Sequence, residues 1–158
     1  MTTDFKNLQA TLAQFIQDLI QTYKSLLIRD DKKATGNLIK SIRPLDIEYS
    51  NNQMTLSISL ASYWKYVEYG RRPGKFPPIN SILNWIKIKP VIPCPINGLK
   101  APSEKQLAFL ISRKIAREGI KPGNQFTEAL KLSWTKWEKT ISDAISKDLN
   151  EAIDLVSL

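Results

Sequence analysis

The sequence contains no histidine and a single cysteine, Cys94. The lack of histidine excludes Ser-His-Asp and Cys-His catalysis, as well as histidine-ligated zinc. One cysteine can form neither a thiolate metal cluster nor an intrachain disulfide, which favours a reducing compartment. Cys94 lies between two prolines and has no general base of the usual kind, so we expect it to be incidental rather than nucleophilic.

Long apolar runs and phosphate-binding glycine motifs are also missing. No run of about 18 or more apolar residues is present to span a bilayer. The N-terminal MTTDFKNLQ lacks the basic segment and apolar block of a signal peptide. Neither GxGxxG nor GxxxxGKS/T occurs. We therefore expect no membrane segment, no nucleotide loop and no cofactor.

Acidic residues are scarce in the middle of the chain. Between Arg71 and Lys121 there are 11 lysines and arginines but two acids, Glu104 and Glu118, a balance of +9. The other residues carry 12 basic and 13 acidic side chains, so the net charge of +8 belongs to the middle third. Such a field suits nucleic acid or the acidic surface of a protein partner, and a well-solvated surface explains it as well.

Hydrophobic periodicity predicts a long helix at each end of the chain. The first runs from Phe5 to about Leu27, capped by one of the residues 2–4 (Thr2, Thr3, Asp4). The second runs from Phe126 to about Val156, capped by Asn124 or Thr127. Its apolar positions are 126, 130, 134, 137, 141, 145, 149, 152/153 and 156. We expect this stripe to pack on the first helix, and the outer half of this long helix could pair with another subunit.

Between these helices the apolar residues recur at every second position, as in a β-strand. A short helical turn over 35–42, with Leu38, Ile39 and Ile42 inward, precedes a β-hairpin over 43–60. Residues 50–53 (SNNQ) form the predicted turn. Two strands alone are marginal in water, so the hairpin must pack on helices or on another chain. The alternating apolar residues are Leu45, Ile47 and Tyr49 in the first arm and Met54, Leu56, Ile58 and Leu60 in the second.

The segment 62–78, SYWKYVEYGRRPGKFPP, joins four aromatic rings to a basic turn. We expect a short helix that ends at Gly70, with Tyr63, Tyr66 and Val67 packed in the fold and Trp64 on the other side. The candidate core or interface aromatics are Tyr63, Trp64, Tyr66 and Tyr69. The candidate contacts to a partner or to DNA are Arg71, Arg72, Lys75, Arg113, Arg117 and Lys121.

Prolines divide the following stretch. Pro77-Pro78 start a helix over about 79–89, and four prolines between 90 and 102 exclude a regular helix there. Ser103 and Gln106 match a capping box for a helix that ends at Gly119. The predicted buried faces are Ile79, Ile82, Leu83 and Ile86 in the first helix, and Leu107, Leu110, Ile111 and Ile115 in the second.

The order of these elements predicts one α+β domain over residues 1–158. A small antiparallel hairpin packs against long N- and C-terminal helices, and residues 77–119 form a helical, proline-rich insertion.

The sequence contains few pairs of acidic residues that could act together in catalysis. A metal-dependent nuclease needs several converging carboxylates, and the pair Asp46 and Glu48 is the one weak candidate. We assign no catalytic, cofactor or metal residue and expect a non-enzymatic protein. The cationic middle with its nearby rings fits base stacking and phosphate contacts. It also fits core or interface rings surrounded by the cations of a protein contact, which we favour.

Three ordered segments carry a resemblance to a known family. They are TGNLIKSI at 35–42, YWKYVEYG at 63–70 and GIKPGNQF at 119–126, the last followed by Glu128-Ala129-Leu130. Together they resemble the tail-completion or neck (minor tail component) proteins of tailed bacteriophages. The chain differs from the usual pattern in the insertion at 77–119, where many relatives have a short basic loop. It also has Gly123-Asn124 where Arg-Pro is common.

The resemblance implies a structural virion protein, assembled in the host cytoplasm. Copies of the chain would form a ring at the head–tail junction, around the DNA channel and beside portal, connector or tail proteins. The alternative is a small basic accessory protein that binds nucleic acid.

Overall fold

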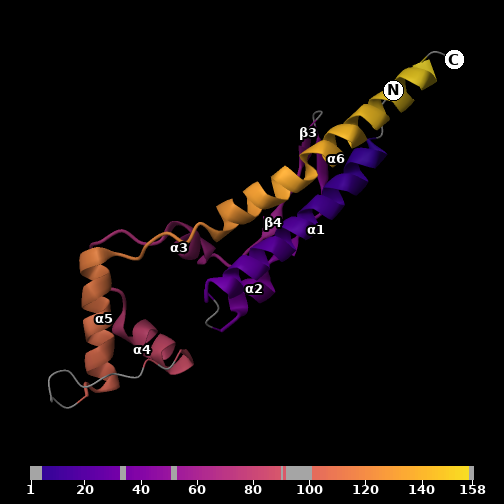
Figure 1. Ribbon diagram of the computed structural model, residues 1–158. Coiled ribbons are helices and arrows are strands. Elements are labelled where there is room, and N and C mark those ends of the chain that lie inside the picture. Colours follow the sequence, from indigo (N-terminus) through magenta and orange to yellow (C-terminus); the bar gives the residue numbers. More distant parts are fainter. Residues whose placement is uncertain (1–4, 33–34, 51–52, 90, 92–100, 157–158) are drawn as a thin grey trace.

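Two long antiparallel helices form the body of the protein (Figure 1). The structure, a computed structural model, describes residues 5–32, 35–50, 53–89, 91 and 101–156. Helix α1 runs from Lys6 to Arg29, and helix α6 from Gln125 to Val156. They lie side by side, and both match the predicted helices to within two residues at each end. The predicted α+β class is confirmed, including the small hairpin and the helical insertion.

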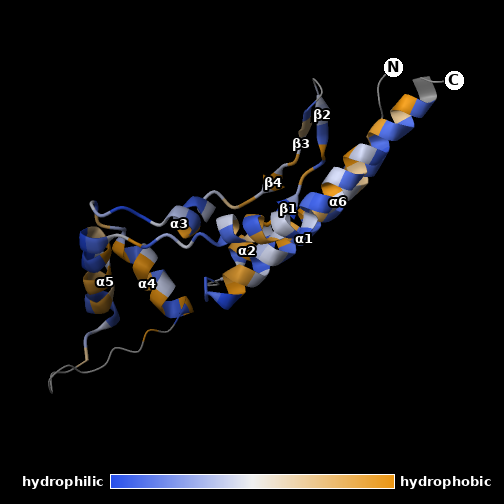
Figure 2. Ribbon diagram, turned by 45° about the horizontal axis from the view of Figure 1, so that its top comes forward, coloured by the Kyte–Doolittle hydropathy of each residue, from blue (hydrophilic) through white to orange (hydrophobic). Residues whose placement is uncertain are grey.

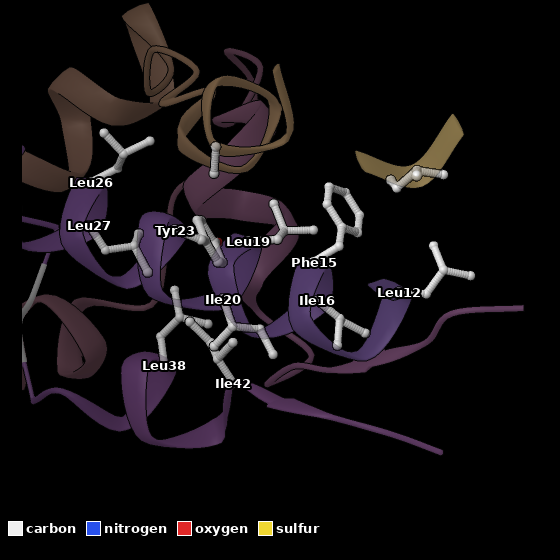
Figure 3. Close-up of a cluster of buried hydrophobic side chains, with 12 residues drawn as sticks. Leu12, Phe15, Ile16, Leu19, Ile20, Tyr23, Leu26, Leu27, Leu38 and Ile42 are labelled. Carbon is white, nitrogen blue, oxygen red and sulfur yellow. The ribbon is translucent and has the colours of Figure 1, made fainter. Parts of the chain in front are cut away.

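The core follows the inner face of α1 (Figure 3). Tyr23 packs edge-on against Phe126, with ring centroids 5.3 Å apart, and Phe15 packs in the same way against Trp134 at 6.3 Å. Removal of this apolar surface from water is the main stabilising force of the fold. The buried cluster comprises Leu12, Phe15, Ile16, Leu19, Ile20, Tyr23, Leu26, Leu27, Leu38, Ile42, Ala129 and Ile141.

A carboxylate from α6 caps the N-terminus of α1. Asp148 accepts hydrogen bonds from the backbone N–H groups of Asn7 and Leu8, at 3.0 and 2.8 Å, and from the Asn7 side-chain amide at 2.7 Å. Burial opposes ionisation of this carboxyl, but the hydrogen bonds outweigh it and lower its pKa below the ordinary value. The predicted caps at 2–4 lie outside the described residues, and α1 begins after Phe5 without a side-chain cap of its own.

The face of α6 that meets α1 differs from the predicted one. The side chains buried against α1 include Ala129, Ser133, Ala144 and Asp148, whereas Leu130, Trp134, Ile145 and Leu149 of the predicted stripe are exposed. Small residues let the two helix backbones approach closely, so the larger apolar side chains lie at the side of the contact. Part of the predicted stripe, including Ile141, does pack in the core.

The predicted hairpin consists of four short strands (Figure 1). Strand β1 (Arg43–Pro44) pairs with β4 (Ile58–Ser59), and β2 (Glu48–Ser50) with β3 (Gln53–Thr55), both antiparallel. Between the two pairs, residues 45–47 stand opposite only 56–57, so one extra residue interrupts the ladder as in a β-bulge.

The bulge changes which apolar side chains of the hairpin are buried. All four apolar residues of the second arm pack on the core, as expected. In the first arm Ile47 does so, but Leu45 and Tyr49 are exposed, contrary to the predicted alternation. The predicted turn includes residues 51–52, which lie outside the described residues. Before the hairpin, α2 (Asn37–Ser41) takes the place of the predicted helical turn, with Leu38 buried.

The insertion forms a helical arm at one end of the body (Figure 1). We call residues 71–121 the arm. It contains α4 (Ile79–Ile88) and α5 (Glu104–Glu118), which pack against each other. The predicted capping box at the start of α5 is confirmed: the Gln106 N–H donates to Ser103 Oγ, and the Ser103 N–H to Gln106 Oε1. Residues 90 and 92–100 of the predicted proline-rich loop, with Cys94, lie outside the described residues.

Candidate functional site

A buried carboxylate on α3 (Trp64–Tyr69) ties that helix to α6. Glu68 is only 1% exposed, and it accepts hydrogen bonds from the Phe126 N–H at 2.8 Å and the Thr127 N–H at 3.0 Å. The Thr127 hydroxyl donates to the same carboxylate at 2.7 Å. The first N–H groups of a helix have no partner within it and attract negative charge, so Glu68 caps α6 from outside. Of the two predicted caps, Thr127 instead donates to Glu68, whereas Asn124 directly precedes the helix and its carbonyl oxygen accepts the Glu128 N–H.

The three sequence segments 35–42, 63–70 and 119–126 meet at α3. From the third segment, the Gly123 and Asn124 N–H groups donate to the Glu68 carbonyl oxygen. From the first, the Ser41 hydroxyl oxygen accepts the Ala61 N–H at 2.9 Å, next to α3. A cavity of about 260 Å³ between the first two segments is lined by Thr35, Gly36, Leu38, Tyr63 and Val67, among others. We call this convergence the junction.

Buried groups near Glu68 show how closely the junction is packed. The Tyr23 hydroxyl is buried there, and burial, assisted by the negative charge of Glu68, raises the pKa of Tyr23 to about 12. Trp64 lies against Phe126, with ring centroids 5.9 Å apart. The motif residues of the junction therefore hold α2, α3 and α6 together, and no arrangement of reactive groups is visible among them.

The predicted orientation of the aromatic segment is wrong for Tyr63, Trp64 and Tyr66 and correct for Val67. Tyr63 and Tyr66 were expected inside, but they are exposed, Tyr66 to 65%. Trp64, expected on the opposite side, packs against the core together with Val67. The reason is that the buried face of α3 is set by Glu68, whose carboxylate must reach the start of α6. Tyr69 is exposed as well, so three of the four rings remain candidates for an interface.

Two glycines shape the neck that joins the arm to the body. Arg71 and Ile120 exchange backbone hydrogen bonds at 2.9 and 2.8 Å, so the chain enters and leaves the arm at one place. A Cβ atom at Gly70 would lie 2.2 Å from the Ile120 carbonyl oxygen, and one at Gly119 would lie 2.2 Å from the Arg71 carbonyl oxygen. Both have positive φ, 68° and 76°, which glycine adopts without strain.

Five of the six predicted contact cations gather at this neck. The Gly74 N–H donates to the Ala116 carbonyl oxygen, which places the basic turn beside the last turn of α5. Of these six, Arg71 donates to the Lys75 carbonyl oxygen, and Arg117 pairs with Glu118, so both are partly engaged. Arg72, Lys75, Arg113 and Lys121 are exposed, with Arg113 one turn further along α5.

The arm carries an apolar surface that the sequence pattern did not single out. Phe76 stacks on Phe109, with ring centroids 6.2 Å apart and planes inclined by 23°, and both rings are exposed. Leu110 was predicted to be buried but is 42% exposed, because Ala108 and Ser112 occupy the inner face of α5. A shallow groove of about 550 Å³ runs over this face, lined by Pro102, Lys105, Gln106, Phe109 and Leu110. We call it the α5 groove.

A second apolar surface lies on the C-terminal half of α6. Ile145, Leu149 and Ile153 recur every four residues and are all exposed, Leu149 to 47%. Apolar and polar residues alternate along this end of the helix (Figure 2). We call these three residues the α6 ridge. They belong to the predicted stripe, which we expected to pack on α1, with pairing of its outer half to another subunit as the alternative.

No site for metal chemistry is found in the described part of the chain. Across these residues, no three Asp, Glu, Cys or His side chains gather closely enough to hold a metal ion. Asp46 and Glu48, the weak nuclease candidates, are exposed next to the bulge. Among the described helices, none is long and apolar enough to cross a membrane.

Comparisons with protein families, with curated proteins and with solved structures return no match to this chain.

Proposed function

We propose that this chain is a structural subunit of a tailed-phage virion. Copies of it assemble into a ring at the head–tail junction, around the channel through which DNA passes. In this proposal the protein is non-enzymatic, and its neighbours are portal, connector or tail proteins.

The observation that carries the proposal is the presence of two unlike apolar surfaces far apart on one elongated chain. Helix α5, which carries the groove, lies at one end of the molecule, and the C-terminal half of α6, which carries the ridge, lies at the other (Figure 1). Apolar surface of this kind is commonly covered by a partner. A ring contact is heterologous, so each subunit needs two different mating surfaces.

The junction gives further support. The three segments that resemble the tail-completion family lie apart in sequence but come together at the junction. A set of residues that holds helices together fits a structural family better than an enzyme family.

The proposal is tested by light scattering of the purified protein over a range of concentrations, with negative-stain microscopy of the same samples. We expect closed particles of uniform mass, or binding to portal or tail components that nucleates them. A chain that stays monomeric and binds none of these components would refute the proposal. Portal, capsid and tail genes next to its gene would support it independently.

One observation favours the alternative of a nucleic-acid-binding accessory protein. In sequence, Arg71, Arg72 and Lys75 lie between the exposed rings of Tyr66 and Tyr69 on one side and Phe76 on the other. This alternative predicts DNA binding with a steep dependence on salt, lost when Arg71, Arg72 and Lys75 are changed to glutamate. Substitution of Lys131, Lys139 and Lys147 on α6 by glutamate alters the net charge equally and serves as the matched control.

A further inference from the structure

We infer that the α5 groove of one copy receives the α6 ridge of the next. This inference rests on the proposed function, since it names the two surfaces that mate in the ring. Four features of the described residues support it: the shape of the groove, the spacing of the ridge, the charge of each, and their distance from each other in one chain.

The residues that line the groove are suited to bind a helix. Its lining combines the apolar side chains of Phe109, Leu110 and Pro102 with the polar side chains of Lys105 and Gln106. Phe76 stacks on Phe109 and adds to the apolar surface next to the groove. Grooves that bind amphipathic helices combine apolar side chains with polar side chains next to them.

The ridge residues have the spacing of an apolar helix face that could fill such a groove. Its residues Ile145, Leu149 and Ile153 follow one another at intervals of four, which puts them on one side of a helix. Asn7 at the start of α1 contacts both Asp148 and Glu151, so residues 152–156 continue beyond this contact for about 7 Å at 1.5 Å per residue. A second copy can therefore approach this end of α6 without meeting the body of α1.

The two surfaces carry opposite charge. The described residues of the arm, 71–89 and 101–121, include ten lysines and arginines and two acids. Residues 138–154 of α6 include five acids and two lysines. Lys105 and Arg113 flank the exposed side chains of the groove by helical spacing. Opposite fields steer the two surfaces together and disfavour groove-to-groove or ridge-to-ridge pairing.

The contact must join two copies, because the groove and the ridge lie at opposite ends of the chain (Figure 1). After one contact forms, the first copy still offers its ridge and the second its groove. The contact therefore propagates from copy to copy, and the rotation between neighbours decides whether a ring closes.

Cysteine cross-linking between two separately labelled populations tests this contact. Both populations carry Cys94→Ser. One carries Leu110→Cys in the groove, and the other carries one cysteine on the ridge, at Ile145, Leu149 or Ile153 in turn. After mixing and mild oxidation we expect a mixed disulfide dimer for at least one ridge position, because a disulfide needs Cα atoms within about 7 Å.

Matched controls come from the same helices. Lys139→Cys lies on α6 away from the ridge, and Glu118→Cys lies on α5 nine residues after Phe109 and therefore on the opposite side of the helix from it. Neither should cross-link above the level of random collision. Reversal of the groove charge by Lys105→Glu and Arg113→Glu should weaken self-association about tenfold, as high salt does. Addition of Asp154→Lys to this variant should restore part of the loss.

The outcomes separate this inference from the proposed function. Closed particles without any ridge-to-groove cross-link refute the inference and leave the ring intact. Ridge-to-groove cross-links in open chains or filaments support the inference and contradict the ring. Protein that neither cross-links nor assembles contradicts both. Cross-links of equal yield at the control positions also overturn the inference, as would assembly unaffected by loss of the groove charge.

Discussion

Two buried carboxylates act at the scale of single residues in this fold. Asp148 caps α1, and Glu68 caps α6, each from a different element. The first four N–H groups of a helix lack partners within it, and its dipole favours a negative charge there. Each carboxylate thus serves as both a cap and a tertiary contact, so its loss affects the helix end and the packing together.

Removal of the Glu68 carboxylate should destabilise the protein strongly. We expect Glu68→Ala to lower the free energy of unfolding by about 2–4 kcal/mol, since buried donors lose charged acceptors. Glu68→Gln keeps one acceptor oxygen and should cost about half as much. Urea unfolding followed by circular dichroism measures both. Glu128→Ala, which removes an exposed partner of Arg29, is the control and should change little. An unchanged urea midpoint in Glu68→Ala would contradict this role.

Asp148 should make the stability of the protein depend on acid. Its pKa is lower in the folded chain than in the unfolded one, where an aspartate titrates near about 3.9. The stabilisation is therefore complete above that value and is lost as the pH falls through the lower, folded pKa. We expect Asp148→Asn to be less stable at neutral pH and to lose less stability on acidification below pH ~4. Thermal melts at a series of pH values test this, and parallel curves for the two proteins would refute it.

At the scale of elements, α6 shows which features could be predicted from the sequence and which could not. Its periodicity predicted the helix and its length, because alternation of threes and fours is a local property. The pattern could not decide which side meets α1, since Ala129 and Ser133 allow close approach while Leu130 and Trp134 are larger. An apolar stripe wider than one partner helix leaves part of itself exposed, and here that part includes the ridge.

In the candidate site, too, the local features were predicted and the long-range contacts were not. Gly70, Gly119 and the Ser103 capping box follow local rules and were predicted correctly. The caps from Glu68 and Asp148 were missed, since each spans a long distance in sequence that no local rule covers. The orientation of the tyrosines on α3 depended on Glu68 and was therefore also missed.

The neck should be the element most sensitive to small substitutions. Gly119→Ala places a Cβ atom 2.2 Å from the Arg71 carbonyl oxygen, so the paired hydrogen bonds between Arg71 and Ile120 cannot form. We expect fast amide exchange at Arg71 and Ile120 while the core of α1 stays protected. Gly74→Ala adds strain but no clash, since no atom lies within 4 Å of its added carbon, and serves as the control. Equal protection of the neck in wild type and Gly119→Ala would refute the prediction.

At the scale of the whole molecule, the body and the arm differ in composition and in attachment. The body has its own buried core and is nearly neutral, whereas the arm is cationic and exposes apolar side chains. Apart from the neck, an ion pair between Lys89 and Asp31 at 2.6 Å joins the arm to the end of α1. A cavity of about 390 Å³ beside this pair separates α4 and α5 from the body. The arm therefore contributes little to the stability of the core.

The body should consequently fold without the arm. A Cβ atom at Gly70 would lie 2.8 Å from the Pro122 backbone nitrogen, so a short Gly-Ser linker can replace residues 71–121 without a gap. We expect this variant to keep cooperative thermal unfolding and the amide protection of α1 and α6, but to lose self-association in light scattering. A second variant that replaces only 77–118 keeps the Arg71–Ile120 bridge and isolates the contribution of the neck. If both variants lack cooperative unfolding, the arm is part of the folding unit. If both fold and still assemble like the full chain, the arm is not the mating surface.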